Sequence, residues 1–185
     1  VFINTRPETQ ARQLSEQLRK QGATVIELPT IEITTPQKKS IPPAWVKDIK
    51  SYDHVIIVSA NAARATAPYW DTYSAPIICV GPATEQSVNQ FHAQTVTPSS
   101  YSSDGILQMQ LLKKVQNKKI LILCGSEHNK NLADNLRKRG AIVNAIVTYH
   151  VKSKAAPNHP TLASITSKEI NGIIITSANS LRILH

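Results

Sequence analysis

The chain has 185 residues, 41% of them hydrophobic and 18% charged, a composition that excludes disordered and fibrous proteins and suits one or two globular cores. Its formal net charge of +9 favours an acidic partner or substrate, although a solvated surface would also account for it. Aromatic residues make up only 5%, too few for a basic face with interleaved aromatics, so we expect a small polyanion as partner and no nucleic acid.

Apolar strands alternate with helices along the whole chain. The first strand is predicted at 1–4, and the helix after it has Thr5 as its N-cap, Pro7 in its first turn and Gly22 at its end. Further strands are predicted at 23–29, 53–59, 77–80, 119–123, 141–151 and 172–176, and further helices from 61 and at 84–90 and 129–139. Continuous apolar strands separated by helices indicate parallel sheets covered on both faces, a doubly wound α/β fold.

The chain repeats itself at an offset of 118 residues. Leu14 and Gly22 recur as Leu132 and Gly140, within a longer helix-to-strand match. The run DHVIIVSANAAR at 53–64 recurs as NGIIITSANSLR at 171–182, with six identities. A period this long predicts two copies of a domain-sized unit, an arrangement that commonly leaves a binding cleft between two lobes.

Two further features concern the segments between and beyond the copies. The runs at 34–43 and 152–161 lie 118 apart and are rich in Pro and Lys, so both are predicted to be linkers, and the strands that enter them could pair as a connector. The first copy continues past Gly81, whose equivalent would fall after His185. We therefore expect the C-terminal part of the second copy, about 50–60 residues, to be missing.

Neither a membrane segment nor a disulfide is expected. No apolar run approaches the roughly 18–20 residues of a membrane helix, and the N-terminus does not resemble a signal peptide. Cys79 and Cys124 lie at the ends of apolar strands without a CxxC motif, which predicts reduced, buried thiols in a cytoplasmic protein.

Small and hydroxylic residues follow the predicted strands, where open α/β sheets bind their ligands. Backbone N–H groups at helix starts favour carboxylates and phosphates, although each Ser or Thr alone could be an ordinary N-cap. The candidate substrate-binding residues are Thr5, Arg6, Ser59, Ala60, Asn61, Gly81, Thr84, Gly125, Ser126, Ser177, Ala178 and Asn179.

Several familiar catalytic sites are absent from the sequence. It has no GxGxxG, no GxxxxGK[ST] and no GxSxG motif, and its histidines show no metal-ligand spacing, so we expect no dinucleotide fingerprint, no phosphate loop and no histidine metal site. Carboxylates near strand ends are also scarce, which disfavours a two-carboxylate hydrolase.

An ordered set of motifs resembles the uroporphyrinogen-III synthase family over essentially the whole chain. The motifs are TRP at 5–7 with the helix after it, SANA at 59–62, VGPAT at 80–84, LRKRGA at 136–141 and TYHV at 148–151. This resemblance implies cyclisation of hydroxymethylbilane to uroporphyrinogen III, with inversion of ring D and loss of water, in haem biosynthesis and without a metal or cofactor. It also implies two Rossmann-like lobes joined by a two-stranded connector, with a composite lobe of 1–33 plus 152–185, a middle lobe of 36–148 and linkers near 34–43 and 149–161.

The resemblance also assigns roles to individual residues. Tyr149 matches the family tyrosine proposed to assist departure of the hydroxyl, and packing is its alternative role. Ser59, Ser177 and Thr84 match residues expected to bind carboxylates. Val58 stands where many relatives have Thr. The eight carboxylates of hydroxymethylbilane suit a chain with a net charge of +9, which we expect to be a monomer.

Two other classes of function remain open. A two-lobed binding protein could close on a small anion without catalysis, and an export signal would favour it. Nucleic-acid binding would require one contiguous basic face and a strong dependence of affinity on salt.

Overall fold

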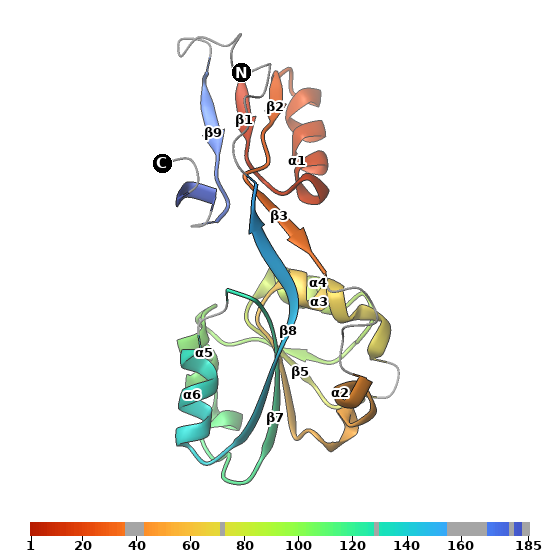
Figure 1. The fold of residues 1–185 in the computed structure, drawn as a ribbon, viewed down its shortest axis with the longest axis vertical. Coiled ribbons are helices and arrows are strands. Elements are labelled where there is room, and N and C mark those ends of the chain that lie inside the picture. Colours follow the sequence, from red (N-terminus) through yellow and green to blue (C-terminus); the bar gives the residue numbers. More distant parts are fainter. Residues whose placement is uncertain (36–42, 71–72, 128–129, 155–169, 178–179, 183–185) are drawn as a thin grey trace. The chain divides into compact units, whose positions relative to one another are not determined.

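The computed structural model describes residues 1–35, 43–70, 73–127, 130–154, 170–177 and 180–182 (Figure 1). The chain divides into two compact units. The larger unit is Thr35–His150, and the smaller combines Val1–Thr34 with Val151–His185. Each unit contains parallel strands, so the mixed α/β fold with parallel sheets predicted from the alternating pattern is confirmed.

The larger unit is built on parallel strands in the order β8-β7-β4-β5-β6. Its strands are β4 (His54–Ile57), β5 (Ile77–Cys79), β6 (Thr95–Val96), β7 (Lys119–Gly125) and β8 (Ile142–Ser153). Its helices are α2 (Pro43–Lys47), α3 (Ala60–Thr66), α4 (Pro82–Val88), α5 (Ser103–Gln108) and α6 (Asn131–Lys138). Short 3-10 turns occupy Ile49–Ser51, Ala67–Tyr69 and Gln110–Leu112.

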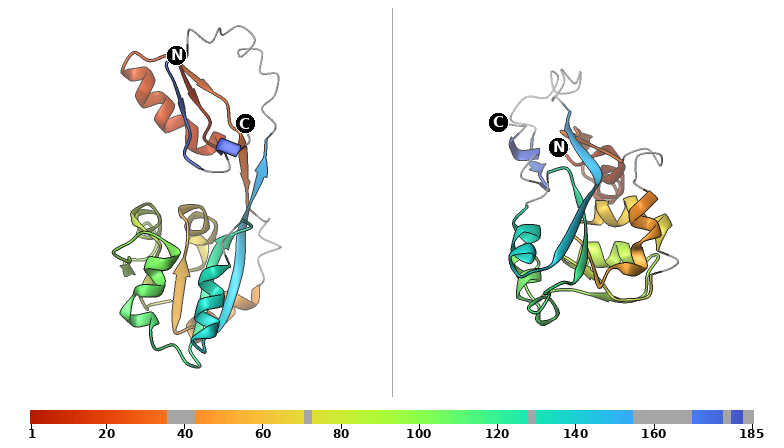
Figure 2. Two further views of the ribbon diagram at one scale, coloured as in Figure 1. Left: turned by 90° about the vertical axis from the view of Figure 1, so that its left-hand side faces the viewer. Right: turned by 60° about the horizontal axis from the view of Figure 1, so that its bottom comes forward.

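Helices cover both faces of this sheet, as Figure 2 shows. Side chains alternate along β4, so Val55 and Ile57 pack toward α3 and α4 while Ile56 packs toward α5 and α6. All three are fully buried. Each buried aliphatic side chain contributes about 1.5–3 kcal/mol through removal of apolar surface from water, which explains the continuous apolar runs in the sequence.

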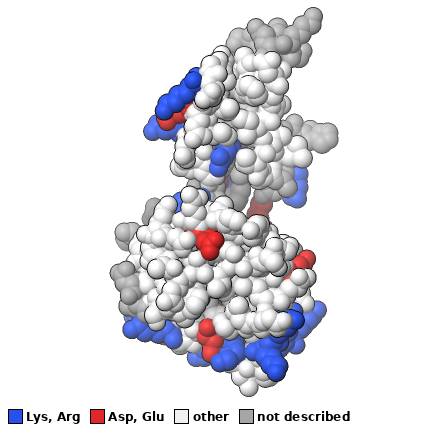
Figure 3. Space-filling view, turned by 180° about the vertical axis from the view of Figure 1, so that it is seen from behind, with Lys and Arg blue, Asp and Glu red and all other residues white. Residues whose placement is uncertain are grey.

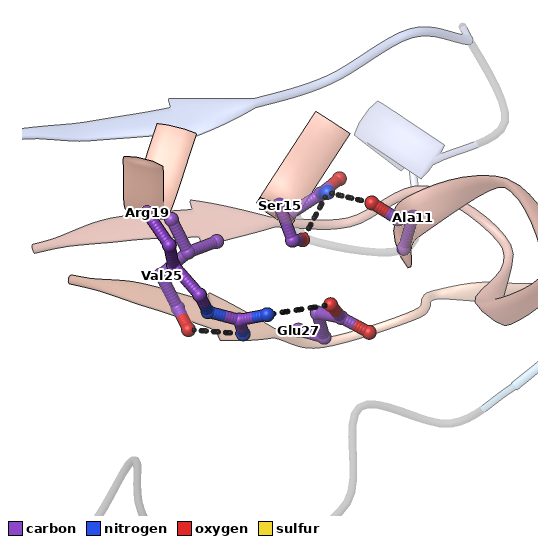
Figure 4. Close-up of polar contacts among 6 residues, drawn as sticks. Ala11, Ser15, Arg19, Val25 and Glu27 are labelled. Atoms are coloured by element: carbon purple, nitrogen blue, oxygen red, sulfur yellow. Dashed lines mark hydrogen bonds and ion pairs between the residues drawn. The ribbon is translucent and has the colours of Figure 1, made fainter. Parts of the chain in front are cut away.

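The smaller unit contains a three-stranded parallel sheet with the order β2-β1-β9. Its elements are β1 (Phe2–Asn4), α1 (Glu8–Lys20), β2 (Val25–Glu27), β3 (Ile31–Thr34) and β9 (Gly172–Ile174). Polar side chains tie α1 to the strands (Figure 4): the Asn4 amide donates to Ser15 Oγ over 3.0 Å, and Arg19 donates to the Val25 carbonyl over 2.9 Å.

The repeat predicted from the sequence includes its helix ends. Gly22 and Gly140 both have φ of +84°, the left-handed conformation that favours glycine after a helix. Ala23 N–H donates to the Leu18 carbonyl over 3.0 Å, and Ala141 N–H makes the same bond to Leu136 over 3.1 Å. The prediction that the first helix ends at Gly22 is therefore confirmed.

Some local expectations differ from the structure. Thr5 is not the N-cap of α1, because Pro7 holds that position and the Thr5 hydroxyl instead donates to the Ile174 carbonyl over 2.8 Å. Elements α2, α5 and β6 were not predicted, and α2 begins at Pro43, the last residue of the first predicted linker. The predicted linkers lie partly in β3 and β8, and their residues 36–42 and 155–161 are outside the described residues.

Cys79 and Cys124 are buried and unbonded to each other, as predicted. Burial raises the pKa of the Cys79 thiol to about 12 and that of Cys124 to about 11, so both stay protonated near neutral pH. In the part of the chain that the structure describes, no helix combines the length and apolar character needed to cross a membrane.

Candidate active site

The carboxyl ends of the larger unit's strands bring together residues that are far apart in the sequence. Ser59 follows β4, Gly125 ends β7 and Tyr149 lies near the end of β8. These strands are neighbours in the order β8-β7-β4. The predicted residues Ser59, Gly125, Ser126 and Tyr149 therefore meet at one edge of the sheet, where α/β proteins bind ligands.

Ser59 has two partners, one in its own helix and one on a distant strand. It is the N-cap of α3, and its Oγ accepts a hydrogen bond from Ala62 N–H over 3.1 Å. The same hydroxyl donates to Tyr149 Oη, also over 3.1 Å. Because the Ser59 proton is used in this bond, the phenol proton of Tyr149 is left for a different acceptor.

Gly125 lies directly beneath the tyrosine ring. A Cβ placed on Gly125 would lie 2.4 Å from Tyr149 Cζ and 2.7 Å from its Oη, which no relaxed structure tolerates. Strand β7, which ends at Gly125, separates β8 from β4. The Tyr149 ring therefore crosses β7 at the one position without a side chain and so reaches Ser59.

A bulge in β8 sets the position of Tyr149. Cys124 is paired with Val147, but the next residue, Gly125, is paired with Tyr149. Thr148 is therefore the extra residue, which is characteristic of a β-bulge. Its side chain is 1% exposed and its hydroxyl donates to the Cys124 carbonyl over 3.1 Å. Ser126 N–H donates to the Tyr149 carbonyl over 3.0 Å, which holds the strand beyond the bulge.

Arg64 adds positive charge near the start of α3. Its guanidinium donates to Asn61 Oδ1 over 2.5 Å and to Ser87 Oγ over 3.4 Å. A guanidinium has five N–H donors, so this one has the capacity to bind a carboxylate as well. The sequence prediction missed Arg64, although its recurrence as Arg182 in the repeat was a usable signal.

The turn after β5 holds two further predicted residues. Gly81 is the N-cap of α4. The exposed residue Tyr101, with 63% of its surface accessible, lies close by, because a Cβ added to Gly81 would be 3.1 Å from the Cβ of Tyr101. Thr84 N–H donates to the Gly81 carbonyl over 3.1 Å, and the residue is only 3% exposed. Ala60 begins α3 beside Ser59.

The smaller unit carries the remaining predicted residues at the ends of its own strands. Thr5 is fully buried, and Arg6 N–H donates to Asn4 Oδ1 over 3.2 Å. Ser177 Oγ accepts from Ser180 N–H over 3.0 Å and lies 2.8 Å from Ser180 Oγ. Ala178 and Asn179 lie outside the described residues.

Much of the positive charge of the larger unit lies away from these strand ends. Exposed lysines gather where β7 begins and α6 ends, the lower end of the larger unit in Figure 3: Lys113, Lys114, Lys118, Lys119 and Lys138. Strand β7 begins at Lys119 and ends at Gly125, so this group is at the opposite edge of the sheet from Tyr149. The net charge alone therefore does not locate the site.

The fold and the strand-end residues define an α/β protein of the class that binds small molecules at the carboxyl ends of parallel strands. The family described as "Uroporphyrinogen-III synthase HemD" matches residues 12–185. The chain therefore belongs to the uroporphyrinogen-III synthase family, whose members are cyclising lyases of haem biosynthesis.

Individual relatives agree with this assignment. The chain is 26% identical over 158 residues to uroporphyrinogen-III synthase of Proteus mirabilis, covering 80% of this chain and 78% of that protein. It is 24% identical over 191 residues to uroporphyrinogen-III synthase of Synechococcus elongatus, covering 98% of this chain and 72% of that protein.

Solved structures share the fold. A mutant uroporphyrinogen III synthase from the extremely thermophilic bacterium Thermus thermophilus has a TM-score of 0.70 at 12% identity, covering 100% of this chain and 75% of that one. Uroporphyrinogen-III synthetase from Helicobacter pylori has a TM-score of 0.61 at 15% identity, covering 99% and 76%.

Proposed function

We propose that the larger unit's strand ends hold hydroxymethylbilane for its cyclisation to uroporphyrinogen III, with Tyr149 as the hydrogen-bond donor to the departing hydroxyl. The observation that carries this proposal is the Ser59–Tyr149 bond of 3.1 Å, in which Ser59 is the donor. The phenol proton is then available to the substrate at the edge of the sheet where ligands bind.

Tyr149 needs only to assist a bond that breaks readily. The carbon–oxygen bond breaks with its electron pair moving to oxygen, and the adjacent pyrrole nitrogen supplies electron density to the carbon. The phenol hydrogen-bonds the leaving oxygen and transfers its proton to it, so that the oxygen departs as water, and the phenolate regains a proton when the product loses one after ring closure. Ring D then attacks the freed carbon, so the enzyme's principal task is to orient that ring.

The carboxylates of the substrate require several donors. Backbone N–H groups at the starts of α3 and α4, beside Ala60 and Gly81, favour anions, and the Arg64 guanidinium adds a full positive charge. We assign further contacts in this unit to Asn61, Thr84 and Ser126. In the smaller unit, Arg6 and Ser177 are candidates for binding carboxylates at that unit's own strand ends. Thr5 would contribute only through its backbone, because its hydroxyl is bonded to Ile174.

The finer architecture is part of the same proposal. We take the two units as two Rossmann-like lobes, which the parallel sheets and the offset of 118 residues support. The protein would act as a monomer on a small polyanion and would not bind nucleic acid. Light scattering at micromolar concentration tests the first statement, and a titration with single-stranded DNA in low salt tests the second.

A coupled assay tests the activity. Freshly made hydroxymethylbilane is added to the protein, the products are oxidised, and uroporphyrin isomers I and III are separated by chromatography. Predominance of isomer III is the expected result. Isomer I alone, formed at the spontaneous rate, would overturn the proposal, and binding of the substrate without turnover would identify an anion-binding protein instead.

A further inference from the structure

We infer that Gly125, Thr148 and Ser59 are positioning residues that together aim the Tyr149 phenol, an inference that rests on the proposed role of Tyr149. None of the three takes part in breaking the carbon–oxygen bond. Each controls a different degree of freedom of the tyrosine, and all of them lie in the larger unit.

Thr148 controls which part of β7 the tyrosine faces. If pairing stayed regular after Cys124↔Val147, Thr148 would pair with Gly125 and Tyr149 would lie on the other face of the sheet. The Thr148 hydroxyl bonds the Cys124 carbonyl over 3.1 Å, which offers that carbonyl a partner at the irregular step. The bulge therefore turns Tyr149 over Gly125.

Gly125 provides the space that the ring occupies. Its φ is not in the left-handed region, which among the described glycines only Gly22 and Gly140 adopt, so its backbone conformation does not require glycine. The need comes from the ring alone, since an added Cβ would lie 2.4 Å from Cζ. An alanine here would force Tyr149 to rotate away from Ser59.

Ser59 fixes the last degree of freedom, the direction of the phenol proton. Its Oγ is held by Ala62 N–H at the start of α3, and its own proton is directed at Tyr149 Oη. The Ala62 amide thus donates to the Ser59 hydroxyl, and the Ser59 hydroxyl donates to the Tyr149 phenol. Ser59 therefore acts through Tyr149 rather than as a ligand of a substrate carboxylate.

A coupled stability experiment tests the role of Gly125 without relying on activity. Both tryptophans, Trp45 and Trp70, lie in the larger unit, so their fluorescence during urea unfolding reports that unit. Gly125→Ala is introduced into the wild-type protein and into Tyr149→Ala. We expect the urea midpoint to fall by at least about 0.5 M in the wild type and to change little in the Tyr149→Ala background. An equal fall in both would overturn the inference.

Kinetics then test positioning against simple loss of structure. Ser59→Ala and Ser102→Ala each remove one helix N-cap, because Ser102 Oγ accepts from Gly105 N–H over 3.0 Å, but only Ser59 contacts Tyr149. Ser59→Ala should lower kcat about tenfold with little change in KM, Ser102→Ala should leave kcat unchanged, and Ser59→Thr should restore most of it. Equal loss of kcat in the two alanine variants would refute the role of Ser59.

These results separate the inference from the proposed function. If Tyr149→Phe keeps full activity while the stability coupling to Gly125 persists, the proposed role of Tyr149 is wrong, and so is any catalytic purpose of the positioning. If Tyr149→Phe is slow but Gly125→Ala shows neither coupling nor loss of kcat, the positioning alone is wrong.

Discussion

The Ser-Ala-Asn segment occurs twice, and its two serines, Ser59 and Ser177, share one hydrogen-bonding contact and differ in the other. Ser59 Oγ accepts from Ala62 N–H over 3.1 Å, and Ser177 Oγ accepts from Ser180 N–H over 3.0 Å. The second contact of Ser59 is the Tyr149 phenol, whereas that of Ser177 is the Ser180 hydroxyl. The cap is a property of the local sequence, and the chemistry depends on which side chain the fold brings to the hydroxyl.

The residues that precede strands β4 and β9 also differ between the two copies. Asp53, before β4, accepts from Lys118 Nζ over 2.8 Å and from Lys119 N–H over 2.9 Å. Its repeat equivalent is Asn171, which cannot ionise and whose side-chain oxygen bonds the backbone nitrogen of Val1. Duplication kept the strand but exchanged a charged contact for a neutral acceptor, so the two copies should respond differently to mutation and pH.

The largest effect is expected at Tyr149. Tyr149→Phe keeps the ring over Gly125 but removes the phenol, so kcat for uroporphyrinogen III should fall about 100-fold while KM changes little. The measurement is the isomer assay over a range of substrate concentrations. Wild-type kcat in the phenylalanine variant would mean that Tyr149 only packs.

The paired serines should differ in kinetics although each removal costs one helix cap, about 1 kcal/mol. Ser177→Ala should raise KM about threefold and lower kcat less than twofold, because among the described residues the Ser177 hydroxyl pairs with the Ser180 hydroxyl rather than with a phenol. Ser59→Ala should instead lower kcat. A tenfold loss of kcat in Ser177→Ala would show that the two serines act alike and would contradict the proposed difference between them.

Asp53 should make the larger unit sensitive to acid. Its hydrogen bonds from Lys118 and Lys119 lower its pKa below 3.8, so its stabilisation is complete well above that pH and is lost as pH falls through the lowered pKa. Because the Lys118 pair is largely solvated, Asp53→Asn should cost only about 0.5–1 kcal/mol at pH 7, and progressively less as pH falls through the lowered pKa. Urea unfolding followed by tryptophan fluorescence measures both values, and a cost that does not depend on pH would contradict the assignment.

The smallest difference is expected between the two helix-ending glycines. Gly22→Ala and Gly140→Ala both force alanine into the left-handed region, at a cost of about 1 kcal/mol each. A Cβ on Gly22 meets nothing within 4 Å, while one on Gly140 would lie 1.9 Å from Gln116 Oε1. Because that atom ends a flexible side chain, the extra cost should stay below about 0.5 kcal/mol. A much larger cost at Gly140 would show that Gln116 is fixed, and urea unfolding of the two variants would measure it.

The sequence by itself determined the α/β class, the repeat and most strand positions. Apolar runs such as 119–123, the glycine helix ends and the serine caps depend on neighbours within a few residues, so a linear pattern records them. The same logic failed at Thr5, whose hydroxyl bonds Ile174, 169 residues further along the chain. It also missed α5, a helix of six residues too short to show a periodicity.

Only the tertiary structure decided how the candidate site is assembled. Ser59 and Tyr149 are 90 residues apart, and their bond depends on strand order, on the bulge at Thr148 and on the absence of a side chain at Gly125. The pairing register depends on two strands together, β7 and β8. The free space above Gly125 depends on three strands, because the ring from β8 crosses β7 to reach Ser59 after β4. Neither property belongs to a single stretch of sequence, so motif and spacing placed these residues at strand ends but could not show that they contact one another.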